Sequence, residues 1–231
     1  MFSFASQNGD FEASFNLMAK LAAQFLVVLV HIHAAGHVHG DLKSDNVAVV
    51  EENGEYRIKL IDYDLAARTQ MVRAYAGTRH TIAPEVVGAA AGALNEAADW
   101  WSYGTTLMWW ASQIMQGLAN HKNNRNEQTR WKKWRPMWWD HQQFLVDSPS
   151  MAHSLPPKLC CFLMSFLTDS PKTRKYNTKT EVLGLMKSSF FNDVDWNSIV
   201  TPRVRKDLQK NTVEFVRNAD DYKDNQEIKD E

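Results

Sequence analysis

The hydrophobic pattern of the first third of the chain predicts one long helix followed by a β-hairpin. Between positions 14 and 35, Ala, Leu, Met and Phe dominate and fall on most faces of a helix, which is typical of a buried helix. Gly36 is a helix stop signal. Two strand-like runs follow at 47–50 and 56–61, and an Asn-Gly pair between them favours a tight turn.

The rest of the chain alternates between weakly patterned segments and apolar helical runs. Residues 65–82 show little periodicity and predict a long loop, and a loop of this length is more often functional than not. Buried helices are predicted at 105–115 and 156–167, with a shorter one near 179–187. The sequence thus predicts a mainly α fold with one small β-hairpin.

The same pattern divides the chain into three parts. Residues 1–13 are polar and predict an irregular segment, and residues 14–200 predict the folded domain. The polar, acidic tail at 201–231 contains few apolar residues near its end, so we expect it to be partly disordered.

Composition indicates an ordinary globular protein in a reducing compartment. The 231 residues are 44% hydrophobic and 23% charged, and the net charge of −1 gives no electrostatic reason to expect a nucleic-acid or membrane partner. Cys160 and Cys161 are adjacent, so no disulfide is expected. The apolar run 21–30 is too short to span a bilayer, and residues 1–10 lack a signal-peptide pattern. We expect the cytoplasm or nucleus.

Polar residues suited to phosphoryl transfer stand at both ends of the predicted hairpin. Asp41 and Asn46 precede its first strand, and Asp62 follows its second strand, so the hairpin brings Asn46 and Asp62 together. Asp41 can orient a hydroxyl group, while Asn46 and Asp62 can hold Mg²⁺ against the phosphates of ATP. The alternative is a polar loop capped by its Asp and Asn side chains.

Two further groups of residues have alternative interpretations. His31 and His33 lie near the end of the first helix and are expected to cap carbonyls or fill the core, since no third ligand is spaced for a metal. Basic and aromatic residues alternate in the stretch 131–139, which contains Trp131, Lys132, Lys133, Trp134, Arg135, Trp138 and Trp139. This stretch could stack on single-stranded RNA, or form an amphipathic helix that binds the core or a protein partner. We expect a protein partner there and consider nucleic acid unlikely on charge grounds.

Taken in order, the motifs resemble the C-terminal lobe of a eukaryotic protein kinase over about residues 12–200. The matching motifs are His39-Gly40-Asp41-Leu42-Lys43 with Asn46, Asp62-Tyr63-Asp64, Gly77-Thr78, Ala83-Pro84-Glu85, Asp99 to Gly104, and Arg174. Phe190-Phe191 and the segment 193–196 resemble the domain end in the basophilic Ser/Thr kinases that second messengers regulate.

The resemblance implies a role for each matching residue. Asp41 would be the catalytic base, and Lys43 would neutralise the γ-phosphate of ATP. Asn46 and Asp62 would bind Mg²⁺. Thr78 would bridge Asp41 and Lys43 and indicate Ser/Thr specificity, while the structural residues would be His39, Glu85, Asp99 and Arg174. Glu85 and Arg174 are expected to form a buried ion pair.

The departures from the family pattern are equally informative. The sequence contains no Gly-rich phosphate loop, no strand Lys for the α- and β-phosphates of ATP and no helix Glu to hold that Lys. About 12 residues precede the first helix. We therefore expect the N-terminal lobe to be absent and Mg-ATP to bind weakly or not at all. Gly40 replaces an Arg that would pair with an activation-loop phosphate, Asp64 replaces a Gly, and Ala74 replaces a phosphorylated Thr.

These features leave one main hypothesis and several alternatives. The main hypothesis is a Ser/Thr protein kinase domain that is inactive alone and needs an N-lobe in cis or in trans. The alternative is a pseudokinase that regulates a kinase or its substrate without catalysis. Remote alternatives are single-stranded RNA binding and a small-molecule kinase. Gly40 and Asp64 resemble the small-molecule kinases, whereas the segments 78–85 and 99–104 do not.

Overall fold

The structure is a computed structural model and describes residues 10–68, 77–88, 95–121, 155–168, 170–172, 174 and 184–199. Several predictions concern residues outside these ranges. They are the Trp-rich stretch 131–139, position 74, the first part of the helix expected near 179–187, and the tail 201–231.

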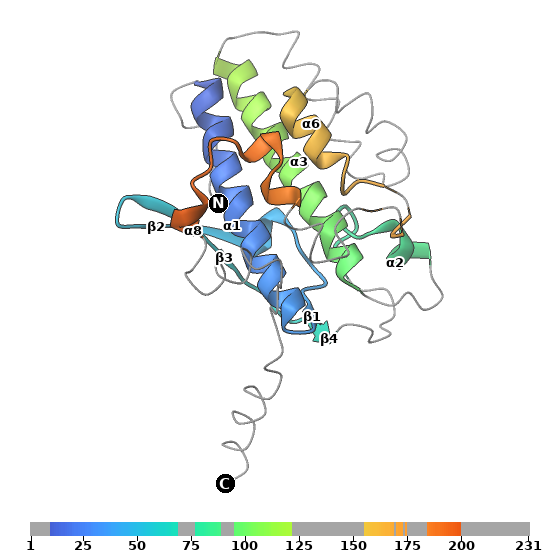
Figure 1. The fold of residues 1–231 in the computed structure, drawn as a ribbon. Coiled ribbons are helices and arrows are strands. Elements are labelled where there is room, and N and C mark those ends of the chain that lie inside the picture. The colour runs from blue at the N-terminus through green and yellow to red at the C-terminus, as the bar shows by residue number, and fades with distance from the viewer. Residues whose placement is uncertain are drawn as a thin grey trace.

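Two long helices form the centre of the fold. Helix α1 (Phe11–Ala34) and helix α3 (Glu96–His121) pack side by side (Figure 1). Helix α1 begins three residues earlier than the hydrophobic pattern predicts. The predicted boundary between the irregular segment and the helix, at residue 13, is therefore wrong. The reason is a cap, because the Asp10 side chain accepts a hydrogen bond from the backbone N–H of Ala13 at 3.1 Å.

Aromatic side chains fill the interface between the two helices. The Tyr103 hydroxyl donates a hydrogen bond to the Ala22 carbonyl at 2.9 Å, so a fully buried polar group is satisfied across the interface. The Tyr103 ring lies 4.9 Å from Phe25 and 5.2 Å from Phe166, measured between ring centroids. Helix α6 (Pro157–Leu163), which precedes Phe166, thereby joins the same core.

The predicted hairpin is present and slightly longer than expected. Strands β2 (Val47–Glu52) and β3 (Glu55–Leu60) pair antiparallel, with Val47 opposite Leu60. Asn53 and Gly54 have φ values of 55° and 78°, as a tight hairpin turn requires.

Helix α1 holds the hairpin through one polar side chain. Gln24 donates from Nε2 to the Tyr56 carbonyl at 3.0 Å and accepts at Oε1 from the Ile58 N–H at 3.1 Å. The amide group therefore satisfies the free edge of β3 much as a neighbouring strand would.

The remaining elements are short. Strands β1 (His37–Val38) and β4 (Ala67–Arg68) pair antiparallel, so the predicted loop 65–82 begins with a two-residue strand. The others are the 3-10 helices η2 (Ser44–Asn46) and η3 (Ser189–Phe191) and the helices α2 (Pro84–Gly88) and α8 (Trp196–Ile199). Helix α6 ends earlier than the predicted residue 167, because i→i−3 bonds such as Phe166 N–H to the Leu163 carbonyl tighten the chain.

Helix α1 is long and apolar enough to cross a bilayer when length and composition alone are considered. An 18-residue window within residues 12–34 has a mean hydropathy of 1.7, and half of that window is buried in the fold. The sequence-based estimate considered only the run 21–30 and therefore understated the helix. Buried core helices also meet these two criteria, and residues such as Leu21 and Phe25 are fully buried.

Gly104 gives a test of the packing between α3 and α6. A Cβ atom at Gly104 would lie 2.8 Å from Cβ of Phe166 and 3.1 Å from Leu167. Gly104→Ala should therefore lower the free energy of unfolding by about 1–3 kcal/mol, measured by urea titration. Gly184→Ala is the matched control, because a Cβ there meets no atom within 4 Å. Equal effects of the two substitutions would contradict this packing.

Candidate active site

One buried carboxylate fixes the start of the predicted catalytic loop. Asp99, in the first turn of α3, is 1% exposed. Its Oδ2 accepts the backbone N–H of His39 at 2.7 Å, and its Oδ1 accepts that of Gly40 at 3.0 Å. The loop is thus held by its backbone, independently of the side chain at position 40.

Two glycines allow the catalytic loop to touch the segment that begins at position 77. Gly40 has φ +80° and Gly77 has φ +122°, and both values favour glycine. A Cβ atom at Gly77 would lie 3.2 Å from the Gly40 carbonyl oxygen, which is a close approach. The absence of side chains therefore lets the two segments lie against each other beside Asp41.

Asp41, Lys43 and Thr78 form a hydrogen-bonded cluster. The Thr78 hydroxyl donates to Oδ1 of Asp41 at 2.7 Å. The Lys43 ammonium donates to Oδ2 of Asp41 at 2.5 Å and to Oγ1 of Thr78 at 3.0 Å. The predicted bridge from Thr78 to Asp41 and Lys43 is confirmed.

The surroundings of Asp41 keep its carboxylate charged. Burial raises the pKa of the Asp41 carboxyl, but the hydrogen bonds from Lys43 and Thr78 outweigh burial and leave the pKa below its ordinary value. Asp41 is therefore an ionised acceptor at neutral pH. This is the state in which a carboxylate can orient a hydroxyl group and accept its proton.

His39 supports the loop as a neutral side chain. Burial lowers the pKa of its imidazole, against the opposing effect of the Asp99 charge. The Asp41 N–H donates weakly to Nδ1 of His39 at 3.4 Å. The Tyr63 ring lies 5.0 Å from the His39 ring, so the loop also contacts the second acidic motif.

Asn46 and Asp62 lie together at the open end of the hairpin, as predicted. The Asn46 carbonyl accepts the Ile61 N–H at 3.0 Å, which places Asp62 directly after this contact. The Asn46 side chain donates from Nδ2 to the Asp41 carbonyl at 2.9 Å, so its Oδ1 is the atom suited to a metal. Asp62 is exposed and has φ +64°.

The donor set of Asn46 and Asp62 fits Mg²⁺. Both residues offer oxygen atoms, and Mg²⁺ in nucleotide sites commonly takes one or two protein ligands and completes its shell with phosphates and water. Within the part of the chain that the structure describes, no three His, Cys, Asp or Glu residues cluster as a metal cage. Asn46 and Asp62 are the residues that would hold Mg²⁺ if it entered with a nucleotide.

The expected ion pair of Glu85 and Arg174 is confirmed. Arg174 donates from Nη1 to Oε1 of Glu85 at 2.6 Å and from Nη2 to Oε2 at 3.0 Å. The Arg174 side chain is 0% exposed and the Glu85 side chain 17%. Arg174 also donates to the carbonyls of Ala97 and Thr168, and its guanidinium lies 5.2 Å from the Trp101 ring centroid. The pair thus ties α2 to the start of α3.

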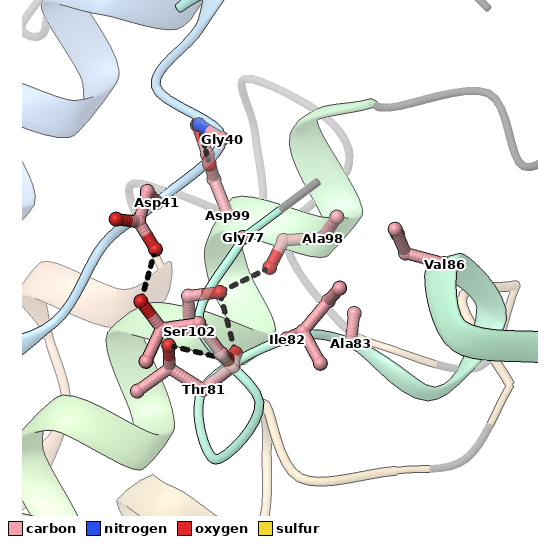
Figure 2. Close-up of a pocket in the computed structure, with 11 residues that line it drawn as sticks. Gly40, Asp41, Gly77, Thr81, Ile82, Ala83, Val86, Ala98, Asp99 and Ser102 are labelled. Carbon is pink, nitrogen blue, oxygen red and sulfur yellow. Dashed lines mark hydrogen bonds between the residues drawn. The ribbon is translucent and has the colours of Figure 1, made fainter. Parts of the chain in front are cut away.

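A pocket opens beside Asp41, between the catalytic loop, the segment 77–86 and the first turns of α3 (Figure 2). Its lining is Gly40, Asp41, Gly77, Thr78, Thr81, Ile82, Ala83, Val86, Ala98, Asp99 and Ser102. The Ser102 hydroxyl lies 2.8 Å from the Thr81 carbonyl and 3.1 Å from that of Ala98, and these contacts hold the Ser102 side chain in the lining. The pocket is next to the carboxylate that would orient an acceptor hydroxyl.

Sequence reasoning missed two contacts to this region. His33 Nε2 lies 2.9 Å from Oδ2 of Asp99, so His33 contacts the anchor of the catalytic loop as well as filling the core. Trp110 donates from Nε1 to the Ser44 hydroxyl at 3.2 Å. Neither residue belongs to a motif that the sequence analysis used. By contrast, His31 caps the Val27 carbonyl at 2.7 Å, as expected.

The carboxylate of Asp41, hydrogen-bonded to Lys43 and Thr78, thus lies beside Asn46, and Asp62 follows the strand that ends next to Asn46. Residues 2–187 match the family model described as "Protein kinase domain". The chain therefore belongs to the protein kinase family, and the kinase-like fold class predicted from the sequence is confirmed. ATP and Mg²⁺ are the normal ligands of this family.

Curated relatives include several Ser/Thr kinases of the ribosomal protein S6 kinase group. The chain is 25% identical to mouse ribosomal protein S6 kinase alpha-3 over 181 residues, which cover 77% of this chain and 22% of the relative. It is 27% identical to Xenopus laevis ribosomal protein S6 kinase 2 alpha over 203 residues, covering 86% and 24%. The human ribosomal protein S6 kinase-related protein is 39% identical over 111 residues, covering 46% and 25%. The matched part is thus about a quarter or less of each relative.

Arg174→Ala should destabilise the protein strongly. Removal of one partner from a buried ion pair costs about 3–5 kcal/mol, because the other charge is left uncompensated. A urea unfolding curve measures the loss. Arg57→Ala is the control, since the Arg57–Glu55 pair is exposed and such pairs contribute about 0–1 kcal/mol. An Arg174→Ala curve that overlays the parental one would contradict a structural role for this pair.

Lys43→Met should destabilise the protein in a pH-dependent way. The folded-state pKa of Asp41 is lowered, so its stabilising contribution is present at neutral pH and is lost as pH falls through that pKa. We expect a loss of about 1–3 kcal/mol at pH 7 that shrinks below about pH 4. Urea unfolding at pH 7, 5 and 3 measures it. Lys59→Met, which removes an exposed ion pair with Glu52, should have little effect at any of these pH values. A pH-independent loss for Lys43→Met would contradict the assignment.

Proposed function

We propose that this chain provides the catalytic-loop half of a protein Ser/Thr kinase, which transfers the γ-phosphoryl group of Mg-ATP to a protein hydroxyl. The observation that carries the proposal is the cluster of Asp41, Lys43 and Thr78, with its three mutual hydrogen bonds. Phosphoryl transfer depends mainly on positioning and charge stabilisation, and this cluster supplies both.

Each residue of the cluster has a task that fits its surroundings. The ionised Asp41 orients the acceptor hydroxyl and receives its proton. Lys43 places a positive charge beside Asp41, where the transferred group would arrive. Asn46 and Asp62 would hold Mg²⁺, which neutralises phosphate charge when it is bound.

The proposal includes dependence on an N-lobe, supplied in cis or in trans. By the family resemblance, these 231 residues contain no Gly-rich phosphate loop and no strand Lys that would bind the α- and β-phosphates of ATP. On the structure, Ile61 is 45% exposed and Tyr63 is 48% exposed, and these large apolar residues flank Asp62. A second lobe that covered the nucleotide would also bury these two side chains.

A regulatory role without catalysis is the second candidate. Gly40 stands where an Arg would receive an activation-loop phosphate, and Asp64 adds negative charge near the metal ligands. Both departures are compatible with a pseudokinase that binds a kinase or its substrate. The Trp-rich stretch 131–139 is then the proposed partner surface. The family match favours a protein over a small-molecule substrate. The cytoplasmic or nuclear setting expected from the sequence is part of this proposal.

The chain alone should bind Mg-ATP weakly and transfer no phosphate. Phosphates would be held from one side and the adenine would stay largely hydrated, whereas tight pockets bury most of their ligand. We expect a Kd near millimolar or weaker, which corresponds to about −4 kcal/mol. Titration calorimetry measures binding, with Asp62→Ala as the test variant and Glu51→Ala on the hairpin as its control. Micromolar binding that Asp62→Ala abolishes would contradict the need for a second lobe.

A chimera separates the kinase proposal from the regulatory one. The N-lobe of an S6 kinase relative, fused ahead of this chain, should restore transfer from radiolabelled ATP to Ser or Thr in a peptide mixture. Asp41→Asn should reduce that transfer at least a hundredfold, because general base catalysis contributes roughly 10²–10⁴ in rate. Arg57→Ala, on the hairpin, should leave it unchanged. A folded chimera that binds Mg-ATP and transfers nothing would favour the pseudokinase.

A further inference from the structure

The two proposed Mg²⁺ ligands are anchored in different ways. Asn46 is 4% exposed, and its Nδ2 donates to the Asp41 carbonyl at 2.9 Å, so the catalytic loop holds its side chain. Asp62 is exposed and comes two residues after the end of β3 at Leu60. The place of Asp62 therefore depends on where strand β3 lies, whereas that of Asn46 depends mainly on the loop.

Strand β3 is held on both of its edges. One edge pairs with β2. The other faces α1, where Gln24 donates from Nε2 to the Tyr56 carbonyl at 3.0 Å and accepts at Oε1 from the Ile58 N–H at 3.1 Å. Along a strand, every second residue presents its N–H and C=O groups to the same edge. A single amide that bonds two such residues therefore fixes the position of β3 along α1 as well as the distance between the two elements.

We propose that Gln24 is a positioning residue for the metal site, because it fixes β3 along α1 and so sets the place of Asp62 relative to Asn46. Ile58 and Leu60 are 8% and 7% exposed and belong to the same core as α1. Apolar packing is non-directional, however, and does not specify one position along a helix. Gln24 adds the directional bonds. The proposal rests on the proposed function, since it concerns the residues that would bind Mg²⁺.

The effect of Gln24 reaches the metal ligands through one backbone hydrogen bond. The Ile61 N–H, three residues beyond the contact of Gln24 with Ile58, donates to the Asn46 carbonyl at 3.0 Å. Because the loop holds Asn46, a movement of β3 would displace Ile61 and Asp62 and lengthen this bond. Mg²⁺ requires nearly ideal octahedral geometry, so displacement of one ligand oxygen weakens its binding.

Amide hydrogen exchange on the full chain tests the coupling without metal or nucleotide. Gln24→Met nearly keeps the size of the side chain and removes both bonds. The amides of Ile58 and Ile61 should then exchange about tenfold faster, the effect of one lost hydrogen bond. Gln24→Glu keeps an acceptor for the Ile58 N–H and loses only the donor to the Tyr56 carbonyl. A carbonyl that loses a donor is tolerated more readily than an N–H that loses its acceptor, so both amides should recover.

The control for these variants is Lys20→Met, because Lys20 is exposed on the same helix. It should change the exchange of neither amide. Parental exchange of Ile61 in Gln24→Met would overturn the proposal. Equal exchange in Gln24→Met and Gln24→Glu would also overturn it, because side-chain volume and not hydrogen bonding would then place the strand.

Mn²⁺ is the probe for the metal ligands, since it prefers the same oxygen ligands as Mg²⁺ and broadens nearby NMR signals. It should broaden the backbone signals of Asn46 and Asp62 in the parental chain. Gln24→Met should need roughly tenfold more Mn²⁺ for the same broadening at Asp62, as when a residue that orients a metal ligand is lost. Equal titrations would overturn the positioning role and leave the metal site intact. Absence of broadening in the parental chain would overturn the metal site of the proposed function, and this proposal with it.

A measurement on the parental chain keeps the proposal falsifiable if Gln24→Met does not fold. One Nε2 proton of Gln24 should exchange with water more slowly than the protons of a free amide, because it bonds the Tyr56 carbonyl. Exchange of both Nε2 protons at the rate of a free amide would overturn the proposal.

Discussion

The carboxylate of Asp99 is the constraint on which the candidate active site depends. A charged group this deeply buried would be unstable without hydrogen-bond donors on its oxygens. The loop backbone at His39 and Gly40 provides two of those donors. If the loop took another conformation, Asp99 would lose these two donors and would be left buried without hydrogen bonds. This free-energy cost stabilises the observed conformation of the loop.

The first turn of α3 also connects this anchor to the ion pair of Glu85 and Arg174. Arg174 donates to the carbonyl of Ala97, two residues before Asp99, while it holds Glu85 of α2. The first turn of α3 thus binds the catalytic loop directly, through Asp99, and the end of the segment 77–88 indirectly, through Arg174. Thr78, in that segment, completes the arrangement by its bond to Asp41. The buried Asp99 thus positions the catalytic loop, which carries Asp41 and Lys43. The buried Arg174 positions the segment 77–88, which carries Thr78.

The sequence predicted the parts of this site that motifs or local rules specify. The Asn-Gly turn defined the hairpin and so the meeting of Asn46 and Asp62, and the family resemblance indicated the pair of Glu85 and Arg174. Contacts that depend on helix packing were not predictable. Gln24 bonds the edge of β3 only because α1 lies against that strand. Strands β1 and β4 are two residues long, too short for any hydrophobic period to show.

The position of Gly40 shows how the ordering of the loop is separated from phosphorylation. An Arg at this position would bring the loop under the control of a phosphate by charge pairing. Glycine removes that control, and the loop is held instead by Asp99 through backbone N–H groups and by Thr78 and Lys43 through Asp41. All of these bonds lie within the described residues and need no modification. The exposed side chains of Ile61 and Tyr63 flank Asp62, one of the two proposed Mg²⁺ ligands. Under the proposed function, these bonds order the side of the site that would face the acceptor hydroxyl, and a second lobe would act on nucleotide binding.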